Sequence, residues 1–198
     1  MLFRSPTWTV PPGILEKDIL PMMKKGVNVL DKKHLKVIDN QGRPVDPKSI
    51  VWSHYSARNF PYMLRQDAGD ENALGRVKIM FPNPYLVYLH DTPSRSLFEK
   101  DRRNFSSGCI RVQKPLELAE RVLADPAAWN PASIDAVVAS GETRTVNLKR
   151  KIPVLLIYWT VDQDASGATV FKPDVYNEDA PLLKALDGTV VSRKRKAA

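Results

Sequence analysis

The chain has 198 residues, of which 43% are hydrophobic and 26% are charged, and its formal net charge is +8. This length and apolar content can bury a core, which excludes a disordered tail and favours one globular domain with room for an inserted lobe. The longest apolar run, Ile152 to Val161, is too short to cross a bilayer, so we expect no membrane span. The first residues, MLFRSPTWTVPP, lack the apolar core of a signal peptide, and nothing in the sequence as given directs export.

The positive charge is spread along the chain, and only the terminal RKRKAA forms a run. We interpret that run as a solvated tail, with a nucleic-acid arm as the alternative. No zinc-finger spacing, RNP-like aromatic pattern or phosphate-binding loop accompanies the charge. We therefore expect no nucleic-acid partner, whereas a positive surface suits an anionic polymer such as a cell wall.

The first region of the chain, residues 8 to 75, is rich in proline. Ile14 to Lys25 is predicted to form a helical turn or two, broken at Pro21, and His34 to Ile38 a short strand. Residues 46 to 64 look like an irregular lobe with four aromatic anchors, Trp52, Tyr55, Phe60 and Tyr62. A polar loop, Gln66 to Gly75, follows.

The second region, residues 76 to 111, is predicted to start with two strands joined at a turn. Val77 to Pro82 forms the first strand, Asn83 and Pro84 the turn, and Tyr85 to His90 the second strand, as in a hairpin or a sheet corner. Because side chains alternate along a strand, Tyr88 and His90 are expected on one face.

The third region, from Val112 onward, begins with helix signals. Pro115 suits a first helical turn, and an apolar stripe continues it through Ala124. Asn130 and Pro131 cap and open a second helix, which runs through Ala139 and is stopped by Gly141. The remaining elements are strands at Thr143 to Leu148 and Pro153 to Val161, a turn at Asp164 to Gly167 leading into Ala168 to Lys172, and a short helix near the end.

The single cysteine, Cys109, excludes an intramolecular disulfide and a cysteine-based zinc site, and we expect neither metal nor cofactor. A lone cysteine is most often an inert core residue. The preceding Ser106, Ser107 and Gly108 favour a sharp turn that leaves backbone N–H groups free, as an oxyanion site requires. A nucleophilic thiol also needs an imidazole, and His90 is the natural candidate.

At these residues the sequence resembles a known family. YLHDTP at 88–93 together with SSGCIRV at 106–112 is similar to the signature of L,D-transpeptidase catalytic domains, the YkuD family, and in particular its YcbB-like branch. The likeness extends to WTVPPGI, LGRVKIMFPNPYLVYLHDTP, IPVLLIYWTV and DVYN, so it covers most of the chain.

The resemblance implies a reaction on peptidoglycan, with donor and acceptor stem peptides as partners. Cys109 matches the nucleophile, which attacks the carbonyl before the terminal D-alanine of a tetrapeptide stem, and His90 matches the general base. The acyl group then passes to a diamino-acid side chain, giving a 3→3 crosslink in cell wall biogenesis, or to water in a carboxypeptidase side reaction. The family also implies that the backbone carbonyl of Asp91 orients the His90 ring, and that the chain works in the periplasm.

Supporting roles are assigned to four further residues. Gly108 and Cys109 would supply backbone donors to the oxyanion. Ser107 would bind substrate or stabilise the turn, and Arg111 would meet a stem carboxylate, pin the turn, or both. Tyr88 would wall the pocket or be an ordinary packed aromatic residue. The Asp91 carboxylate is interpreted as a turn group and not as a third catalytic group.

The fold class implied by the resemblance is mostly β with α: a partial β-sandwich, an inserted irregular capping lobe and helices after the catalytic turn. Residues 1–198 would form the catalytic domain without its first strands, and residues 14–75 the substrate-capping lobe. An inactive remnant and a non-catalytic basic binding domain are the alternative functions. The sequence leaves the oligomeric state open.

Overall fold

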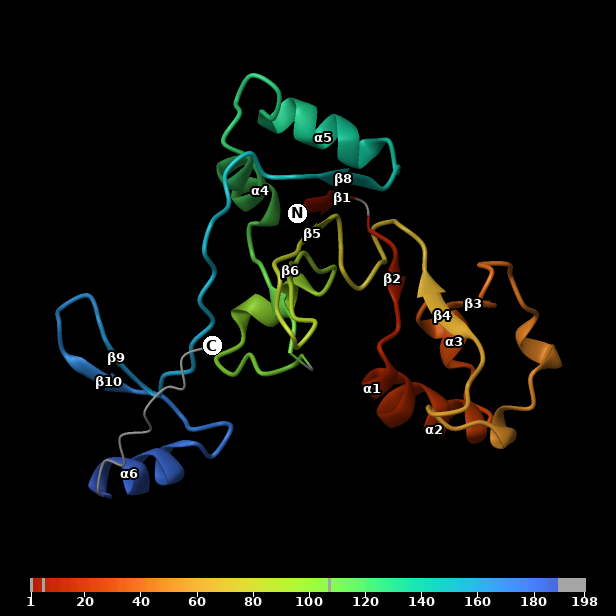
Figure 1. The fold of residues 1–198 in the computed structure, drawn as a ribbon, viewed down its shortest axis with the longest axis horizontal. Coiled ribbons are helices and arrows are strands. Elements are labelled where there is room, and N and C mark those ends of the chain that lie inside the picture. The colour runs from red at the N-terminus through yellow and green to blue at the C-terminus, as the bar shows by residue number, and fades with distance from the viewer. Residues whose placement is uncertain (1, 5, 107, 189–198) are drawn as a thin grey trace, which may run out of the picture. The chain divides into compact units, whose positions relative to one another are not determined.

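The computed structural model describes residues 2–4, 6–106 and 108–188 (Figure 1). Ser107 and the basic run at 193–198 therefore lie outside the described residues. The chain forms two compact units, Met1–Ile152 and Pro153–Ala198.

The larger unit contains a five-stranded sheet with strand order β7-β6-β5-β1-β8. In chain order its strands are β1 (Leu2–Arg4), β5 (Val77–Ile79), β6 (Leu89–His90), β7 (Ile110–Arg111) and β8 (Arg144–Val146). Neighbouring strands are antiparallel except β6 and β7, which are parallel. The two strands predicted to form a hairpin or a sheet corner, those that contain Val77 and His90, pair antiparallel, and both are shorter than expected.

Two helices follow the turn that holds Cys109, as the sequence predicts. α4 (Pro115–Leu123) begins at a proline and ends where Ala124 adopts a left-handed conformation. α5 (Pro131–Ala139) is capped by the Asn130 side chain, which accepts a hydrogen bond from the Ser133 N–H. α4 contacts β5 and α5, and the apolar cluster at this contact comprises Val77, Ile79, Ala119 and Leu123.

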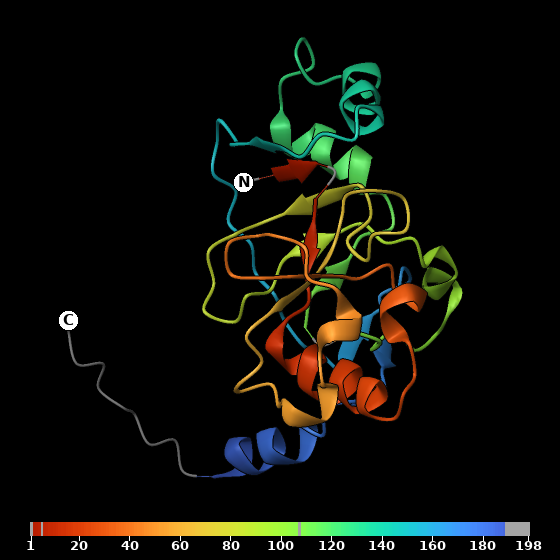
Figure 2. The same cartoon turned by 90° about the vertical axis from the view of Figure 1, so that its right-hand side faces the viewer.

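A three-stranded sheet and a helical run form a second part of the same unit (Figures 1 and 2). The sheet order is β2-β4-β3, made of β2 (Trp8–Thr9), β3 (Lys36–Ile38) and β4 (Met63–Gln66). The helices are α1 (Pro12–Ile14), the π-helical η1 (Leu15–Ile19), α2 (Leu20–Lys24) and α3 (Val29–Lys32). They enclose a separate apolar core of ten buried residues: Val10, Leu15, Ile19, Leu20, Val29, Leu30, Leu35, Val37, Ile50 and Leu64.

The predicted break at Pro21 is wrong. Pro21 lies in the first turn of α2, which directly continues η1. The wider π-turn before it already departs from the regular hydrogen-bond ladder.

The predicted aromatic lobe at 46 to 64 is confirmed. It contains two short 3₁₀ helices, η2 (Pro47–Ser49) and η3 (Trp52–His54). All four predicted anchors are in ring contact within one cluster: Phe60 lies 5.6 Å from Trp52, 5.7 Å from Tyr55 and 5.5 Å from Tyr62 between centroids. Phe60 is therefore the centre of the aromatic cluster.

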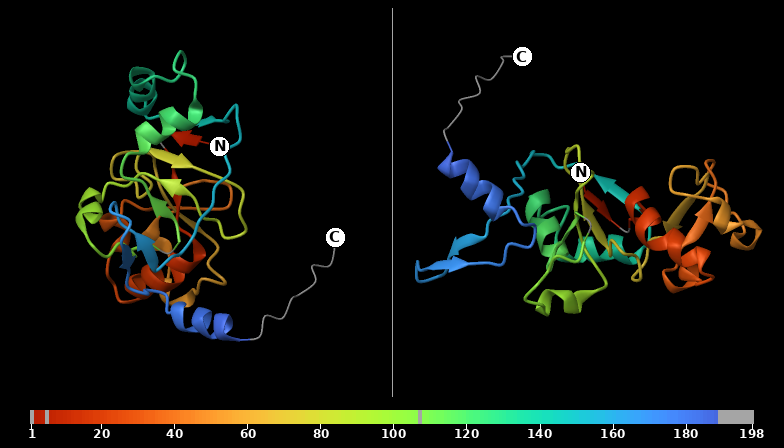
Figure 3. Two further views of the ribbon diagram at one scale, coloured as in Figure 1. Left: turned by 90° about the vertical axis from the view of Figure 1, so that its left-hand side faces the viewer. Right: turned by 90° about the horizontal axis from the view of Figure 1, so that it is seen from below.

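The smaller unit contains the hairpin of β9 (Val161–Gln163) and β10 (Thr169–Phe171), followed by α6 (Asp179–Asp187) (Figure 3). The predicted turn at Asp164 to Gly167 and the last helix are confirmed. The predicted strand Pro153 to Val161 is wrong: 153–160 has no strand, and Leu155 is 82% exposed. A strand needs a neighbour for its backbone groups, and in this unit pairing with another strand begins only at Val161, the first residue of β9.

The mixed α+β class is confirmed by these sheets and helices. Among the described residues, none of the helices has the length and apolar character needed to span a bilayer.

Candidate active site

One face of the five-stranded sheet gathers the residues with catalytic chemistry. In the strand register His90 is paired with Lys78 on β5 and with Arg111 on β7. Paired residues on neighbouring strands project to the same side, and side chains alternate along each strand. Lys78, His90 and Arg111 therefore share a face, and Tyr88 and Cys109, two positions before His90 and Arg111, are directed to it as well.

The opposite face of β5 packs on the core. Val77 is fully buried and Ile79 nearly so, both in the apolar cluster with α4. Since these two residues flank Lys78, their burial fixes the direction of the lysine side chain away from the core. The same alternation turns Leu89, between Tyr88 and His90, toward that core.

His90 is buried, with 6% of its surface exposed. Its Nδ1 contacts the backbone carbonyl of Asp91. Because a carbonyl can only accept, Nδ1 carries the proton, and Nε2 keeps the lone pair that a general base requires. The expected contact between the ring and the Asp91 carbonyl is confirmed.

The charge state of His90 follows from its surroundings. Burial lowers the pKa of His90, and the nearby Arg111 and Lys78 cations lower it further, whereas the hydrogen bond to the Asp91 carbonyl and the Asp91 charge oppose them. The imidazole is consequently neutral at neutral pH and ready to accept a proton.

The Asp91 carboxylate is hydrogen-bonded to Arg76 and Arg95. Its side chain is 5% exposed, and it accepts hydrogen bonds from the Arg76 N–H at 3.0 Å and from Arg95 Nη1 at 3.1 Å. Gly75 lies against it with φ +56, and a Cβ there would be 2.5 Å from Asp91 Oδ2. These contacts give Asp91 a structural role. Its carboxylate binds the chain just before β5, and its backbone carbonyl contacts the His90 ring.

Cys109 is half-buried and follows a tight turn. Gly108 has φ +139, a conformation that favours glycine, and its N–H donates to Ser106 Oγ at 3.1 Å. The Ser106 hydroxyl donates in turn to the Cys109 carbonyl. The Gly108 N–H predicted for the oxyanion is thus bound by Ser106 in this structure, and Ser107 lies outside the described residues.

Tyr88 lies beside His90, and Cys109 is among the neighbours that shift its pKa. Its ring is 5.8 Å from the His90 ring in an edge-to-face arrangement. Burial, and then the neighbouring Cys109, raise the pKa of Tyr88. Trp8, a neighbour of Tyr88, packs against the core of the three-stranded part, so it joins that part to the site.

The Arg111 side chain lies on the same face and has a hydrogen-bond donor without an acceptor in the described chain. Its Nε is buried, and within the described chain no acceptor is hydrogen-bonded to it. A buried guanidinium nitrogen without a partner costs free energy unless an anionic or polar group completes its hydrogen bonds.

Lys78 is the site residue that the sequence analysis missed. Its Nζ lies 3.9 Å from the centre of the Tyr88 ring. Burial lowers the pKa of Lys78, and the neighbouring Cys109 acts in the opposite direction. The sequence does contain one indication: Lys78 is a single lysine between two apolar residues of a predicted strand. Once the pairing of this strand with that of His90 is known, Lys78 can be assigned to the same face as His90.

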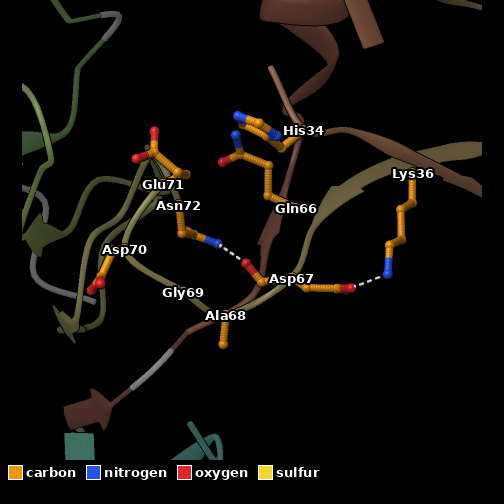
Figure 4. Close-up of a pocket in the computed structure, with 9 residues that line it drawn as sticks. All are labelled: His34, Lys36, Gln66, Asp67, Ala68, Gly69, Asp70, Glu71 and Asn72. Atoms are coloured by element: carbon orange, nitrogen blue, oxygen red, sulfur yellow. Dashed lines mark hydrogen bonds and ion pairs between the residues drawn. The ribbon is translucent and has the colours of Figure 1, made fainter. Parts of the chain in front are cut away.

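A separate polar hollow of about 320 Å³ lies where β4 leaves the three-stranded sheet (Figure 4). Its hydrogen-bonding groups are largely used within the protein: Asp67 pairs with Lys36, Asn72 Nδ2 donates to the Asp67 carbonyl at 2.7 Å, and Gln66 Oε1 accepts from the Ala73 N–H. The hollow has no lining residue in common with the face around His90.

Comparison with known proteins agrees with this geometry. Residues 2–156 match the profile of the L,D-transpeptidase catalytic domain, YkuD. The chain belongs to the YkuD L,D-transpeptidase family. This YkuD chain is also 39% identical over 178 residues to a Haemophilus influenzae protein whose name assigns it provisionally as an L,D-transpeptidase. That alignment covers 90% of this chain and 36% of the relative, so the chain spans about a third of the relative's length.

Proposed function

We propose that the chain is an L,D-transpeptidase that joins peptidoglycan stem peptides through an acyl-enzyme on Cys109, in the periplasm. The proposal rests on one observation: the register of β5, β6 and β7 directs Cys109 and a neutral, oriented His90 to a single face. Tyr88 supports it, because its ring packs against His90 and the neighbouring Cys109 raises its pKa.

In the first half-reaction the Cys109 sulfur attacks the carbonyl carbon before the terminal D-alanine of a tetrapeptide stem. The thiol proton goes to Nε2 of His90. Backbone N–H groups of Gly108 and Cys109 stabilise the oxyanion, which requires the Ser106 hydroxyl to release the Gly108 N–H. When the tetrahedral intermediate collapses, the C–N bond breaks, His90 returns the proton to the amine, and D-alanine leaves.

In the second half-reaction the side-chain amine of a diamino acid on a neighbouring stem attacks the thioester. His90 Nε2 takes a proton from this amine, the C–S bond breaks, and Cys109 is regenerated with a 3→3 amide bond formed. A neutral His90 suits this step, because an imidazolium could not accept the proton. Water in place of the amine gives the carboxypeptidase reaction.

Substrate recognition is assigned to the groups around the two catalytic residues. The unsatisfied Nε of Arg111 suits a stem carboxylate, which would complete its hydrogen bonds. Tyr88 forms a wall of the pocket. Residues 14–75 act as a substrate cap, and Trp8, which packs against the core of this part and is a neighbour of Tyr88, supports a link between that cap and the site.

The test combines substrate turnover with acylation. Purified protein is incubated with a synthetic tetrapeptide stem, and D-alanine release and crosslinked dimer are followed by mass spectrometry; a carbapenem serves as a second acylating agent, located by peptide mapping. We expect an adduct on Cys109 and its loss in Cys109→Ser. His90→Gln should abolish turnover, while His54→Gln, an exposed histidine of η3, should leave it unchanged.

Two outcomes would overturn the proposal. A folded wild-type protein that forms no adduct with either reagent would identify an inactive remnant. Salt-sensitive DNA binding that is unchanged in Cys109→Ser, without turnover, would identify a basic binding domain.

A further inference from the structure

The connection between β6 and β7 carries an arginine that contacts the chain beyond the end of each strand. It runs from Asp91 to Cys109, and Arg95 begins its short 3₁₀ helix η4 (Arg95–Glu99). The Arg95 guanidinium donates through Nη1 to the Asp91 carboxylate at 3.1 Å and through Nη2 to the Gln113 carbonyl. Asp91 directly follows β6, and Gln113 lies two residues after β7. One side chain thus joins the ends of both strands.

These two strands are short, so few backbone hydrogen bonds fix their separation. Each has two residues, and parallel pairs are slightly less stable per residue than antiparallel ones. The Val112 N–H donates to the His90 carbonyl at 2.8 Å, beside the point where Arg95 joins the two chains. Because His90 ends β6 and Cys109 directly precedes β7, a shift between the strands changes the distance from the imidazole to the sulfur.

The surroundings of Arg95 favour a fixed geometry at this junction. Its side chain is half-exposed, but the Asp91 side chain that it pairs with is only 5% exposed, unlike the fully exposed ion pairs that contribute little. The central carbon of the guanidinium lies 5.3 Å from the centre of the Phe98 ring. A planar guanidinium presents several donors in a rigid arrangement, so it can hold two acceptors at once in a way that an ammonium cannot.

We propose that Arg95 is a positioning residue, which holds His90 at the distance from Cys109 that proton transfer requires. It acts through Asp91, whose backbone carbonyl contacts the His90 ring, and through Gln113, beyond the end of β7. The inference rests on the proposed function, in which His90 takes the thiol proton and returns it to the leaving amine. It adds to that step a residue of the connection between the two strands.

The test measures turnover of the tetrapeptide stem by Arg95→Met, which keeps an unbranched side chain but removes both donors. The groups assigned to substrate binding are unchanged and the alignment of imidazole and sulfur is lost, so kcat should fall about 10- to 100-fold while KM stays within about twofold. Arg95→Lys keeps a cation beside Asp91 without the two-armed geometry, so it should recover stability in urea but not kcat. Wild-type kcat in either folded variant would overturn the inference.

Two other arginines serve as matched controls. Arg76 also pairs with the Asp91 carboxylate, with Nε 3.7 Å from Oδ2, so Arg76→Met removes a cation from Asp91 and leaves the Arg95 contacts in place. Arg103 lies in the same connection and donates to the Lys100 carbonyl. Arg76→Met and Arg103→Met should both keep kcat within about twofold of wild type. Equal losses in Arg76→Met and Arg95→Met would overturn the inference, because they would assign the effect to the charge beside Asp91.

A measurement without a stem peptide separates this inference from the proposed function. Amide hydrogen exchange, followed by NMR, reports on the Val112 N–H that donates to the His90 carbonyl. Exchange at Val112 should be faster in Arg95→Met and unchanged in Arg103→Met. Unchanged exchange in Arg95→Met would overturn the inference even where the wild type is active. Faster exchange together with a wild type that releases no D-alanine would refute the proposed function alone.

Discussion

Gly75→Ala tests how strongly the Asp91 carboxylate is fixed behind the catalytic histidine. Gly75 has φ +56, and an added Cβ would lie 2.5 Å from Oδ2, 2.6 Å from Cγ and 2.7 Å from Cβ of Asp91. The carboxylate has little freedom to move, because the Arg76 N–H and Arg95 hold it from two directions. The substitution therefore strains the backbone and also displaces a buried charge.

The magnitude follows from these two contributions. A left-handed alanine costs about 1 to 2 kcal/mol relative to glycine. Weakening the charge-assisted hydrogen bonds of Asp91 adds about 1.5 to 3 kcal/mol, nearer the lower value because Arg76 and Arg95 are half-exposed. We expect Gly75→Ala to lower the free energy of unfolding by about 3 kcal/mol or more.

Gly141→Ala is the matched control. Gly141 has φ +68, and a Cβ added there would meet no atom within 4 Å, so only the backbone contribution applies. Urea unfolding of both variants, followed by circular dichroism, gives the comparison, and alkylation of Cys109 in the folded proteins reports on the site. If the two unfolding free energies agree within about 0.5 kcal/mol, the carboxylate is not held as described.

Three further predictions follow from the site and its supports. Asn83→Ala removes a side chain that donates hydrogen bonds to the Phe81 and Val87 carbonyls and accepts hydrogen bonds from two backbone N–H groups. The free energy of unfolding, measured by urea titration, should therefore fall by about 2 kcal/mol, and a fall of less than about 0.5 kcal/mol would contradict these contacts. Asn130→Ala removes the cap of α5 and should cost about 1 kcal/mol by the same assay, with unchanged stability as the contrary result. Burial lowers the pKa of His90, so the unfolded chain binds more protons than the folded chain below about pH 6.5, and the free energy of unfolding should fall as the pH drops through that range. His90→Gln should flatten this dependence on pH, whereas His54→Gln should not. Equal slopes in the wild type and both variants would contradict a buried neutral His90.

Local sequence rules accounted for much of the larger unit. α4 and α5 were predicted closely because proline at the first turn, the Asn130 cap and the apolar stripe act over a few residues. The common face of Tyr88 and His90 followed from strand alternation alone. The turn geometry of Gly108 was also expected, although its hydrogen bond to Ser106 was not.

Features that depend on distant partners were not predictable in the same way. Lys78 became a site residue only through the pairing of β5 with β6, which no local pattern specifies. The strand expected at Tyr85 to His90 is short because Leu86 adopts φ +56 in a turn held by the Asn83 side chain. The apolar run at 153 to 160 has strand-like composition, but composition does not provide a neighbouring strand.

The exposed apolar run has a practical consequence for every assay above. Leu155, Ile157 and Trp159 are 82%, 55% and 65% exposed, in a segment rich in β-forming side chains. Such a segment is prone to pair with its counterpart in another molecule when protein is concentrated. Rates and unfolding midpoints should therefore be collected over a dilution series, since a value that changes with concentration would describe an associated species and not the single chain.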